Sequence, residues 1–523
     1  IAIEVVFDEA EINREIEEEE TSPNTVLQNG LPSRVNWRHV ANTEEGQLNQ
    51  EQRSTFDIIL NTVANPSLAQ NRLFFVTGEG GTGKTFLFNC IFARLKTDQK
   101  TYIAAASTGI AALLLRDGQT AHKTFCINND INEESESRIS YESRYGDAIR
   151  HSSLIVIDEV SMLNRVVFDY IDRVVRSVHD PHLRHLPFAG KVVVISGDFK
   201  QLCPVVKGGT TIDQVLASIK GSNLFSLFIH LELKQNMRLD PNEVDFGKWL
   251  LDVGNGRNMI DLDGHIAIPD GCQVKEAQQL LDFCFPPAAL QKPLEHFREL
   301  KGGLILATTN ETHDCLSEQL MKQIPYEETE FRSVDKLLND DDTSAGVLAV
   351  DVHSDDYSIE SVNRQTPTGL PPHKLKLKVG AIVMVIRNLS LREKLTNGTV
   401  LQIVEIKKDV IKCRRRDTDV ADDEFVFLTR IKFEYGTGEN DRTVKFQRIQ
   451  FPIRVAFAST INKAQGQTLD RVGLYFFGQQ AFAHGQLYTA FSRVKKKAGV
   501  KVYCAGNVRN NALLNVVYKE LLL

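Results

Sequence analysis

Residues 73–85 read Leu-Phe-Phe-Val-Thr-Gly-Glu-Gly-Gly-Thr-Gly-Lys-Thr, and no other stretch says as much about the fold. A short apolar run leads into a glycine-rich turn that ends in Gly83-Lys84-Thr85, and residues 86–95 continue as an apolar, helix-like segment. From Gly78 to Thr85 the spacing is that of the G-x-x-x-x-G-K-[ST] phosphate loop. This motif requires a strand before the turn and a helix after it, so the sequence predicts a nucleotide-binding α/β domain.

The residue types in this loop follow from the chemistry of phosphate binding. Glycines allow backbone N–H groups to turn toward phosphate oxygens, and the start of the following helix adds a favourable partial charge. Lys84 can reach the β- and γ-phosphates, while the Thr85 hydroxyl can hold Mg²⁺. The predicted phosphate-binding residues are Gly78, Gly80, Gly81, Thr82, Gly83, Lys84 and Thr85.

Two further strand ends carry polar side chains that suit the same chemistry. Residues 154–157 form an apolar run that ends in Asp158-Glu159; we expect Asp158 to hold Mg²⁺ and Glu159 to orient or deprotonate a water. The alternative is a strand end with two solvated acids. Residues 191–195 form another apolar run, and Gln201 beyond it can sense a γ-phosphate, although the residues between them also suit an ordinary turn.

Apolar stretches with strand character alternate with helical segments over much of the chain. These stretches are residues 101–105, 154–157, 191–195 and 303–307. Such alternation predicts a parallel sheet covered by helices on both faces. Between about 371 and 450 the strands become short and closely spaced, which predicts a small antiparallel barrel or sandwich inserted into the α/β scaffold. The predicted strands of this insertion are residues 381–386, 399–406, 410–413, 424–431 and 443–448.

Length, charge and cysteine usage bound the function without identifying it. The 523 residues suggest about two to four domains, and no apolar run reaches the roughly eighteen residues of a membrane span, so we expect no membrane partner. The net charge of −7 arises in the first twenty residues, which hold nine acidic residues and one arginine, so charge does not exclude a nucleic acid. Eight scattered cysteines without a C-x-x-C pair argue for a reducing compartment.

Taken together, the motifs resemble those of a superfamily-one DNA helicase, in the PIF family of the B branch. The match runs from about residue 46 to about residue 510 and keeps the family's order. The matching segments are Leu48-Asn49-x-x-Gln52, Ser107-Thr108-Gly109-Ile110-Ala111-Ala112, Thr120-Ala121-His122, Asp158-Glu159-Val160-Ser161-Met162, Gly197-Asp198-x-x-Gln201-Leu202-x-Pro204-Val205, Gln235-Asn236-Met237-Arg238, Thr460-Ile461-Asn462-Lys463-Ala464-Gln465-Gly466-Gln467-Thr468 and Tyr488-Thr489-Ala490-Phe491-Ser492-Arg493-Val494.

The resemblance implies two RecA-like α/β domains with ATP and Mg²⁺ in the cleft between them, and an inserted SH3-like antiparallel β-barrel. Gln52 would then recognise adenine, and Gly466 would belong to the nucleotide site. Two arginines supplied by the second domain would reach the phosphates when the cleft closes. The implied catalytic residues are Lys84, Glu159, Gln201, Arg238 and Arg493.

The resemblance also predicts where the domains begin and end. Residues 1–45 are expected to form an acidic, partly disordered extension. The first RecA-like domain, 1A, is expected at residues 46–230, with a small 1B element near 126–150; the second, 2A, at 231–370 and 451–523; and the SH3-like 2B insertion at 371–450.

Single-stranded DNA and duplex junctions are the partners that the resemblance implies, with movement in the 5′→3′ direction. Such binding relies on backbone and stacking contacts rather than on sequence reading. Phe125 can equally be a core aromatic, and Asn462 stands where many relatives have histidine. The candidate DNA-binding residues are Thr108, Gly109, His122, Phe125, Thr460, Asn462 and Lys463.

A basic cluster lies within the predicted insertion. It consists of Lys407, Lys408, Lys412 and residues 414–416. The cluster suits phosphate binding. The alternative is a solvated hairpin, because Asp417, Asp419, Asp422 and Asp423 follow and balance the charge.

Three segments resemble more narrowly the helicase of eukaryotic Helitron rolling-circle transposases and their close PIF relatives. They are Leu395-Thr396-Asn397-Gly398-Thr399, Phe451-Pro452-Ile453-Arg454-Val455-Ala456-Phe457-Ala458-Ser459-Thr460 and His484-Gly485-Gln486-Leu487-Tyr488. A complete Helitron protein carries an upstream nicking domain with a His-apolar-His metal motif and a catalytic tyrosine. This sequence has no such triad, so we expect the helicase part alone, with a nicking domain as a candidate partner.

The leading interpretation is an ATP-driven 5′→3′ DNA helicase in the nucleus. A RecD-type subunit of a nuclease complex is a second enzyme interpretation, although such subunits usually lack the His-Gly-Gln-Leu-Tyr sequence. A third interpretation is a non-catalytic, nucleotide-gated DNA-binding module, against which the intact Lys84, Asp158 and Arg493 argue. Residues 495–497 are lysines that suit either a weak nuclear signal or a solvated turn.

Overall fold

The computed structural model describes residues 35–65, 71–128, 131–206, 208–338, 359–367, 369–390, 393, 395–415, 425–436, 445–506 and 512–522. Most of the predicted acidic extension lies outside these residues. The chain divides into two compact units. Among the described residues, the larger unit comprises those up to 283, those at 304–309 and those from 460 onward, and the smaller unit comprises 284–303 and 310–459.

A six-stranded parallel sheet organises the first half of the larger unit. Its strands, in pairing order, are β3 (Gln119–Thr120), β2 (Tyr102–Ala106), β4 (Leu154–Asp158), β5 (Val193–Gly197), β1 (Leu73–Gly78) and β6 (Ile229–Leu233). The pairings between neighbours in this sheet are all parallel. The strands predicted at 101–105, 154–157 and 191–195 are confirmed, with ends shifted by at most two residues.

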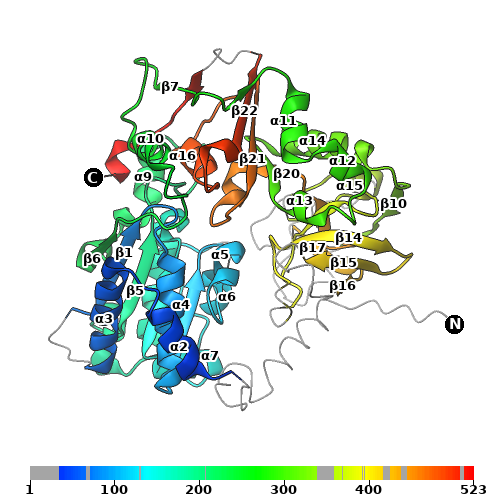
Figure 1. The fold of residues 1–523 in the computed structure, drawn as a ribbon. Helices are drawn as coiled ribbons and strands as arrows, with labels where there is room; N and C mark the ends of the chain where they lie inside the picture. Colours follow the sequence, from blue (N-terminus) through cyan, green and yellow to red (C-terminus); the bar gives the residue numbers. More distant parts are fainter. Residues whose placement is uncertain are drawn as a thin grey trace. The chain divides into compact units, whose positions relative to one another are not determined.

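Helices cover both faces of this sheet (Figure 1). They are α2 (Trp37–Glu45), α3 (Gln50–Ala64), α4 (Lys84–Thr97), α5 (Gly109–Leu114), α6 (Ala121–Thr124), α7 (Arg144–His151), α8 (Arg165–Ser177) and α9 (Thr211–Ala217). Side chains of β1 alternate between two apolar cores. Phe74 and Val76 join the core formed with α3 and α4. Leu73 and Phe75 join the core formed with α8, so the strand is apolar throughout.

Helix α2 lies within the predicted N-terminal extension, yet it is anchored to the first sheet's helices. Glu45 forms an ion pair with Arg94 of α4, with 2.5 Å between Oε1 and Nη2, and Glu44 forms an ion pair with Arg116. The side chain of Asn36 caps the start of α2 by accepting from the backbone N–H of His39 at 3.2 Å. The acidic residues of this part of the extension are therefore structural partners of arginines rather than solvated charges.

A second parallel sheet forms the other half of the larger unit. Its strands pair in the order β9 (Gly303–Ala307), β21 (Arg471–Phe477), β22 (Val500–Ala505) and β8 (Gln273–Val274). This half also contains α10 (Val244–Asn255), α11 (Ala277–Cys284), α16 (Gln486–Phe491) and the antiparallel pair of β7 (His265–Ala267) and β23 (Ala512–Leu514). The strand predicted at 303–307 is confirmed, and the two parallel sheets confirm the predicted α/β class.

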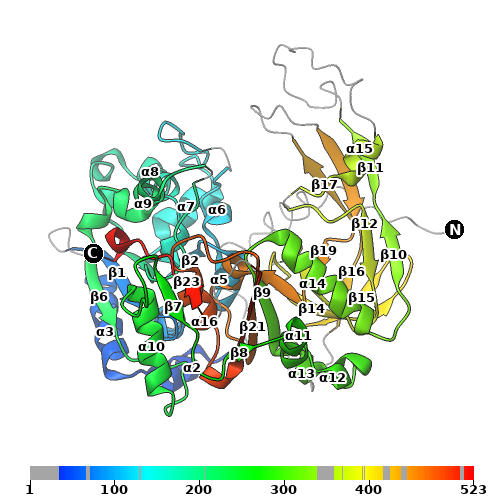
Figure 2. The same cartoon turned by 90° about the horizontal axis from the view of Figure 1, so that it is seen from above.

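The smaller unit is built from antiparallel strands and short helices (Figures 1 and 2). Its strands are β10 (Thr329–Arg332), β11 (Val334–Leu337), β12 (Lys374–Leu377), β13 (Ile382–Val385), β14 (Val400–Ile406), β15 (Ile411–Arg415), β16 (Phe425–Leu428), β17 (Ile431–Tyr435), β18 (Phe446–Gln450) and β19 (Ile453–Val455). Its helices are α12 (Pro287–Gln291), α13 (Phe297–Lys301), α14 (Asn310–Gln323) and α15 (Ile359–Arg364). No helix in the described part of the chain is long and apolar enough to cross a membrane.

The strands of the smaller unit form three antiparallel sheets, in the orders β16-β15-β14-β13-β19, β11-β18-β17 and β10-β12. The predicted antiparallel character is thus confirmed. The single strand predicted at 424–431 is wrong, because β16 and β17 are separate strands in different sheets. Strands β10, β11 and β19 lie outside residues 371–450 but belong to these sheets, because they pair with β12, β18 and β13, respectively.

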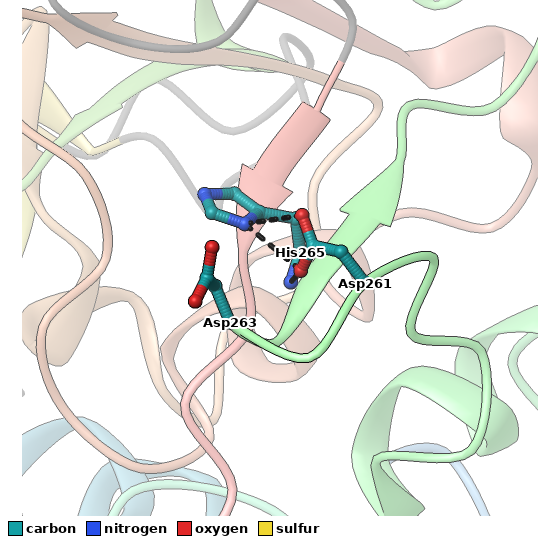
Figure 3. Close-up of side chains that lie close together, drawn as sticks. All are labelled: Asp261, Asp263 and His265. Atoms are coloured by element: carbon teal, nitrogen blue, oxygen red, sulfur yellow. Dashed lines mark hydrogen bonds and ion pairs between the residues drawn. The ribbon is translucent and has the colours of Figure 1, made fainter.

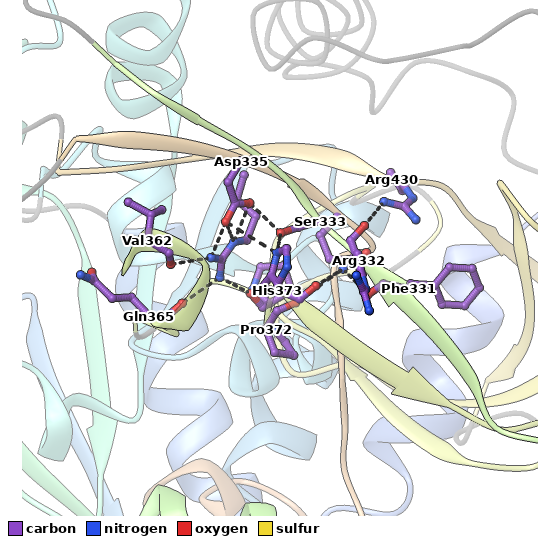
Figure 4. A network of polar contacts seen from close by, with 12 residues as sticks. Phe331, Arg332, Ser333, Asp335, Val362, Gln365, Pro372, His373 and Arg430 are labelled. Atoms are coloured by element: carbon purple, nitrogen blue, oxygen red, sulfur yellow. Dashed lines mark hydrogen bonds and ion pairs between the residues drawn. The ribbon is translucent and has the colours of Figure 1, made fainter. Parts of the chain in front are cut away.

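A network of polar contacts that includes Asp335, Val362 and Gln365 joins elements of the smaller unit (Figure 4). Arg448 of β18 is fully buried and forms an ion pair with Asp335 of β11, with 2.6 Å between Nη2 and Oδ2. Its Nη1 donates to the carbonyls of Gln365 and Pro371 at 3.0 Å, and its Nη2 donates to the carbonyl of Val362 at 3.1 Å. These bonds fix β11, β18 and α15 relative to one another, and they satisfy the charge in the interior.

Candidate nucleotide-binding site

The phosphate loop runs from the end of β1 to the start of α4, where the motif predicts it. Gly81 and Gly83 have φ values of 104° and 81°, a region that side chains other than glycine rarely adopt. A Cβ atom at Gly81 would lie 2.6 Å from Cβ of Arg238, and one at Gly83 would collide with the amide nitrogen of Gln52. Both glycines are thus required by backbone conformation and by space.

Lys84 is the first residue of α4, and its side chain folds back across the loop. Its Nζ donates to the carbonyl oxygens of Gly78 at 2.6 Å and Glu79 at 3.2 Å, and the residue is only 8% exposed. Thr82 closes the same turn by donating its hydroxyl to Glu79 O at 3.0 Å. The ammonium group therefore lies inside the loop, where phosphate oxygens can replace the carbonyl acceptors.

Gln52 fixes the loop from the side of α3. Its side-chain nitrogen donates to the carbonyl of Thr82 at 3.0 Å, and its side-chain oxygen accepts from the backbone N–H of Asn49 at 3.1 Å. The backbone N–H of Gln52 donates in turn to the Asn49 side chain at 2.9 Å, which completes a capping box at the start of α3. The structure thus places Gln52 against the phosphate loop, and its recognition of adenine stays a prediction.

Asp158 lies at the end of β4 and is 3% exposed. Its carboxylate accepts from the hydroxyl of Ser196 and from the backbone N–H of Glu159, the latter at 2.8 Å. Burial, followed by the neighbouring charge of Glu159, raises the pKa of Asp158 to about 6. A divalent cation would relieve both effects, and the carboxylate of Asp158 with the hydroxyl of Thr85 forms the hard-oxygen donor set that Mg²⁺ prefers.

Glu159 adopts a left-handed backbone conformation, with φ of 56° and ψ of 39°. Its carbonyl oxygen accepts from the hydroxyl of Ser107 at 2.7 Å, and its carboxylate accepts from the side-chain amide of Gln465 at 2.9 Å. A non-glycine residue in this region is uncommon and is held there by its surroundings. The two anchors fix the direction of the Glu159 carboxylate beside Asp158.

Three side-chain donors converge on the phosphate loop at Gly80. A Cβ atom at Gly80 would lie 3.3 Å from Nη2 of Arg493, 3.5 Å from Nη1 of Arg238 and 3.6 Å from Nε2 of Gln201. The glycine therefore leaves open a small space that guanidinium and amide N–H groups surround. Donors arranged around a phosphate loop in this way suit a phosphoryl group that carries several negative oxygens.

Arg493 is almost fully buried and Arg238 is partly buried, and neither forms an ion pair with the described residues. Burial and the nearby charge of Arg238 lower the pKa of Arg493 to about 9, and burial lowers the pKa of Arg238. Arg493 donates from Nε to the carbonyl of Thr489 at 2.8 Å, and Arg238 donates from Nη1 to the carbonyl of Ser492 at 2.8 Å. Neutral carbonyls orient both groups without neutralising them, so an anionic ligand fits between them.

Gln201 completes this arrangement and is 2% exposed. Its side-chain nitrogen donates to Oδ2 of Asp198 at 3.2 Å, whereas its side-chain oxygen is buried and has no hydrogen-bond partner in the described part of the chain. A buried amide oxygen that lacks a partner is uncommon and indicates a missing donor, such as a water or a ligand group. The residues of the loop and its surroundings therefore fit a nucleoside triphosphate.

Four residues of the site are absent from the predicted set. Asn236 donates to the carbonyl of Gly80 at 3.3 Å, and its side-chain oxygen accepts from the backbone N–H of Arg238 at 2.9 Å. The others are Gln465, Asp198 and Tyr488, of which Tyr488 donates its hydroxyl to Asp198 at 2.9 Å. All four stand inside the motif segments as polar side chains, but their partners lie at other motifs, so only the tertiary fold identifies their roles.

The prediction that Phe125 contacts DNA is wrong, and the alternative, a core aromatic, is what the structure shows. Phe125 is fully buried in the apolar core that includes Phe168 and Phe188, so its ring cannot stack on a base. Thr108 caps α5 by accepting from the backbone N–H of Ala111 at 3.2 Å, and Gly109 is the first residue of that helix. His122 is half-buried on α6, and burial lowers its pKa.

The remaining predicted DNA-binding residues follow one another in a single segment. Thr460 ends β20 (Ala458–Thr460), and Asn462 and Lys463 lie in the short 3₁₀ helix η8 (Ile461–Ala464). Gly466 has φ of 82°, and a Cβ atom there would lie 3.8 Å from Cγ2 of Ile110 in α5. The structure thus places Gly466 beside α5 rather than on the phosphate loop, and Gln465 is the residue of this segment that reaches the nucleotide-site carboxylates.

The basic cluster of the smaller unit is partly paired. Nζ of Lys412 lies 3.8 Å from the ring centroid of Phe425, and Lys407 forms an ion pair with Glu405 at 3.3 Å. The guanidinium of Arg414 lies 4.8 Å from the ring centroid of Phe297. Arg416 and the balancing aspartates lie outside the described residues. A role for this cluster in phosphate binding stays a prediction.

A second group of possible metal ligands lies away from the phosphate loop (Figure 3). Asp261, Asp263 and His265 offer ligand atoms that lie within 4.8 Å of one another. Nδ1 of His265 contacts Oδ2 of Asp261 at 2.9 Å, and the backbone N–H of His265 donates to Oδ1 of Asp261 at 3.0 Å. Asp263 is exposed. These contacts already account for the geometry as an ion pair that closes the turn before β7.

Comparison with known proteins identifies related sequences over most of the chain. A family model described as PIF1-like helicase matches residues 47–262, and one described as DNA helicase Pif1, 2B domain, matches residues 360–406. The ATP-dependent DNA helicase PIF1 of Xenopus laevis is 28% identical over 457 residues, which cover 85% of this chain and 60% of that protein. The ATP-dependent DNA helicase Pif1 of Bdellovibrio bacteriovorus is 26% identical over 460 residues, with 87% and 88% coverage. The chain thus spans less than two thirds of the Xenopus protein's length.

Solved structures share the fold. The Pif1 helicase from Bacteroides, crystallised in complex with ADP-AlF3 and ssDNA, superposes with a TM-score of 0.63 at 22% identity, covering 91% of this chain and 96% of that one. The Pif1 helicase from Candida albicans superposes with a TM-score of 0.61 at 23% identity, with 91% and 98% coverage. These likenesses support the two parallel sheets as RecA-like domains.

Proposed function

Because the chain belongs to the PIF1-like helicase family, we propose that it hydrolyses ATP at the site described above and uses the free energy to unwind DNA. The observation that carries this proposal is the convergence of Arg493, Arg238 and Gln201 on Gly80, within 3.6 Å of a Cβ atom at that glycine. Donors in this position stabilise charge on a transferring phosphoryl group, which favours hydrolysis over nucleotide binding alone.

In the first step of the proposed mechanism, the phosphate loop exchanges its internal contacts for the nucleotide. Lys84 moves its hydrogen bonds from the carbonyls of Gly78 and Glu79 to phosphate oxygens. The backbone N–H groups of the loop and of the first turn of α4 bind the same oxygens. Mg²⁺, held by Thr85 and Asp158, would neutralise part of the phosphate charge.

In the second step, Glu159 orients the attacking water and accepts its proton. Its carboxylate is already directed by Gln465 at 2.9 Å, which removes much of the cost of positioning it during the reaction. The side-chain oxygen of Gln201, which has no partner among the described residues, is available to accept a hydrogen bond from the same water. Both groups lie at the carboxyl ends of neighbouring strands of the first sheet.

In the third step, Arg238 and Arg493 stabilise the charge that spreads over the γ-phosphoryl oxygens. An arginine in this position accelerates phosphoryl transfer by roughly 10³–10⁵-fold. Arg493 is attached to α16, which belongs to the second half of the larger unit. Hydrolysis therefore removes an anion that the two halves hold in common, and the loss of this shared contact supports coupling to movement on DNA.

The DNA strand is proposed to contact α5 and η8. Thr108 and Gly109 begin α5, and Asn462 and Lys463 lie in η8, which Gly466 brings next to α5. Single-stranded binding of this kind needs backbone donors and cations rather than base-specific contacts. We propose movement in the 5′→3′ direction, which rests on the likeness of the motifs to the PIF family.

Unwinding of tailed duplexes tests this proposal. A duplex with a 5′ single-stranded tail and one with a 3′ tail of equal length are mixed with the protein, ATP and Mg²⁺. We expect ATP-dependent separation of the 5′-tailed duplex alone, and none by the Lys84→Ala variant. Separation of the 3′-tailed duplex alone would contradict the polarity, and separation of neither would contradict the helicase activity.

We further propose that the chain is the helicase part of a Helitron-type transposase, or of a related genome-maintenance helicase, that works in the nucleus. The sequences of residues 451–460 and 484–488 support this origin, and the eight cysteines, all among the described residues and none in a disulfide, support a reducing compartment. A fluorescent fusion expressed in eukaryotic cells checks the location. Exclusion of the fusion from the nucleus would contradict this part of the proposal.

A further inference from the structure

Tyr488 is a buried residue at the nucleotide site that none of the proposed steps uses. It lies on α16, is 2% exposed, and packs so tightly that a Cβ atom at Gly254 of α10 would lie 2.9 Å from its ring. A buried phenol needs hydrogen-bond partners for its hydroxyl. The Tyr488 hydroxyl has two hydrogen-bond partners, and both belong to the half of the larger unit that contains the six-stranded sheet.

The hydroxyl of Tyr488 joins the phosphate loop to Asp198. It donates to Oδ2 of Asp198 at 2.9 Å and accepts from the backbone N–H of Gly80 at 3.4 Å. The phenol has a single proton, which goes to the carboxylate as the stronger acceptor, so its oxygen lone pairs face the Gly80 N–H. Burial, followed by the charge of Asp198, raises the pKa of Tyr488 well above its usual value, so the phenol stays protonated near neutral pH.

Asp198 extends this connection to Gln201. Its Oδ2 atom accepts from Tyr488 and also from the side-chain nitrogen of Gln201 at 3.2 Å. The orientation of the Gln201 amide therefore depends on where Tyr488 holds the carboxylate. The connection extends to Arg493 through the chain itself, because Arg493 lies two residues beyond the end of α16, the helix that carries Tyr488.

The start of α16 is docked on the loop that carries Asp198 and Gln201. A Cβ atom at Gly485 would lie 2.5 Å from the carbonyl oxygens of both Lys200 and Gln201, so no space separates the two segments. Nε2 of His484 lies 2.7 Å from the carbonyl oxygen of Phe199, and its Nδ1 accepts from the backbone N–H of Tyr518 at 2.8 Å. Because Nδ1 is an acceptor, Nε2 carries the proton and donates to Phe199.

We propose that Tyr488 is a positioning residue that places the Gly80 N–H, the Gln201 amide and Arg493 relative to one another around the phosphoryl group. This inference rests on the proposed hydrolysis of ATP. The Tyr488 hydroxyl accepts from the Gly80 N–H, and a phosphate oxygen of a bound nucleotide would compete for that N–H. The phenol then bonds Asp198 alone, and the change reaches Gln201 through the shared carboxylate and Arg493 through Tyr488 itself.

Tyr488→Phe tests the inference, because it removes one oxygen and keeps the ring in its packing. Loss of a hydrogen bond to a charged partner predicts a kcat for ATP lowered by about 10- to 100-fold, with KM changed by less than about threefold. The matched control is Tyr170→Phe, which removes the hydroxyl of another buried tyrosine. Tyr170 lies on α8, and its hydroxyl donates to the carbonyl of Glu136 at 3.3 Å. We expect both variants to melt at similar temperatures and only Tyr488→Phe to lose turnover.

A double variant separates positioning from general destabilisation. If Tyr488 acts through Asp198, adding Tyr488→Phe to Asp198→Asn lowers kcat little further, because the two changes break one connection. The inference would be overturned if the fold-losses in kcat of the two single variants multiplied in the double variant. It would also be overturned if Tyr488→Phe turned over ATP as fast as the wild-type protein under the same conditions.

Hydrogen exchange with adenylyl-imidodiphosphate provides a readout that does not need hydrolysis. We expect the nucleotide to protect peptides covering residues 78–85 and 486–493 in the wild type, but only the first in Tyr488→Phe. Equal protection of both peptides in both proteins would overturn the role of Tyr488 alone. No protection of residues 78–85 in the wild type would instead contradict nucleotide binding, and with it both the proposed function and this inference.

Discussion

Glu159 shows how single residues of this site are held in place for chemistry. Its left-handed backbone is stabilised by the Ser107 hydroxyl at 2.7 Å, and its carboxylate is directed by Gln465 at 2.9 Å. Such strain costs of the order of 1–3 kcal/mol and persists where the surroundings fix it, often at functional sites. The side chain that the sequence predicts as the base is therefore fixed by residues that come from two other motifs.

Glu159→Gln is expected to stop hydrolysis while leaving the binding of ATP and DNA intact. The amide keeps the size of the side chain but cannot accept the proton of the water, so turnover should fall by about 10²–10⁴-fold. Steady-state hydrolysis and equilibrium binding of a fluorescent ATP analogue check this outcome. Glu232→Gln, at a side chain that is 60% exposed at the end of β6, is the control. Normal hydrolysis by Glu159→Gln would show that another group is the base.

The buried carboxylate of Asp158 predicts how Mg²⁺ binding depends on pH. Its pKa is raised to about 6, and Mg²⁺ binds only the ionised form. The affinity for Mg²⁺ is therefore full above about pH 6 and falls by about tenfold for each pH unit below it. An aspartate with an ordinary pKa would keep its affinity for Mg²⁺ down to about pH 4. Calorimetric titration with Mg²⁺ and ADP, from about pH 5 to about pH 8, measures the change. Affinity that stays constant down to about pH 4.5 would argue against a buried metal ligand.

Much of the nucleotide site could be predicted residue by residue, and the reason is local chemistry. The phosphate loop, Asp158 and Glu159 need particular side chains at fixed spacings, and the structure brings them together with Gln201, Arg238 and Arg493. Tyr488 and Asp198 could not be predicted, because their roles arise from a contact between distant segments. Phe125 was ambiguous for a similar reason, since burial depends on packing partners elsewhere in the chain.

At the scale of elements, a single ion pair organises the smaller unit. Arg448 and Asp335 are both fully buried and tie β18 to β11, while the other donors of Arg448 hold α15 and the loop after it. A buried pair adds little net stability compared with apolar residues, but removing one partner leaves an uncompensated charge. The pair therefore specifies which elements meet rather than how stable they are.

Asp335→Asn is expected to destabilise the smaller unit by about 3–5 kcal/mol, because Arg448 stays buried without its counter-charge. Glu405→Gln, which breaks an exposed pair with Lys407, should cost no more than about 1 kcal/mol. Hydrogen exchange of peptides covering residues 446–450 measures the opening free energy of β18 in both variants. Equal protection in the two variants would mean that the buried pair does not hold β18.

The elements that could be predicted are those whose own residues decide them. The central strands β2, β4 and β5 are buried on both faces and read as continuous apolar runs. The boundary between β16 and β17 could not be predicted, because only two residues separate the strands and only their different partners place them in different sheets. Helix α2 was not predicted, because the ion pairs that its acidic residues form with Arg94 and Arg116 depend on the tertiary fold.

At the scale of the whole molecule, the complete nucleotide site lies within the larger unit. Its residues extend from Gln52 to Arg493, so the site is assembled from the two parallel-sheet halves of that unit. The proposed DNA-binding residues on α5 and η8 belong to the same unit. Occupation of the two sites can therefore be coupled through residues that both halves share, such as Gln465 and Tyr488.

ATP hydrolysis with and without single-stranded DNA is the most direct test of this coupling, with Lys84→Ala as the blank. The account predicts turnover that DNA stimulates strongly and that Lys84→Ala abolishes, since Lys84 lies inside the phosphate loop. Turnover that depends on Lys84 but ignores DNA would contradict the coupling of the two sites. Absence of turnover under both conditions would contradict the proposed enzyme and favour a nucleotide-gated DNA-binding module.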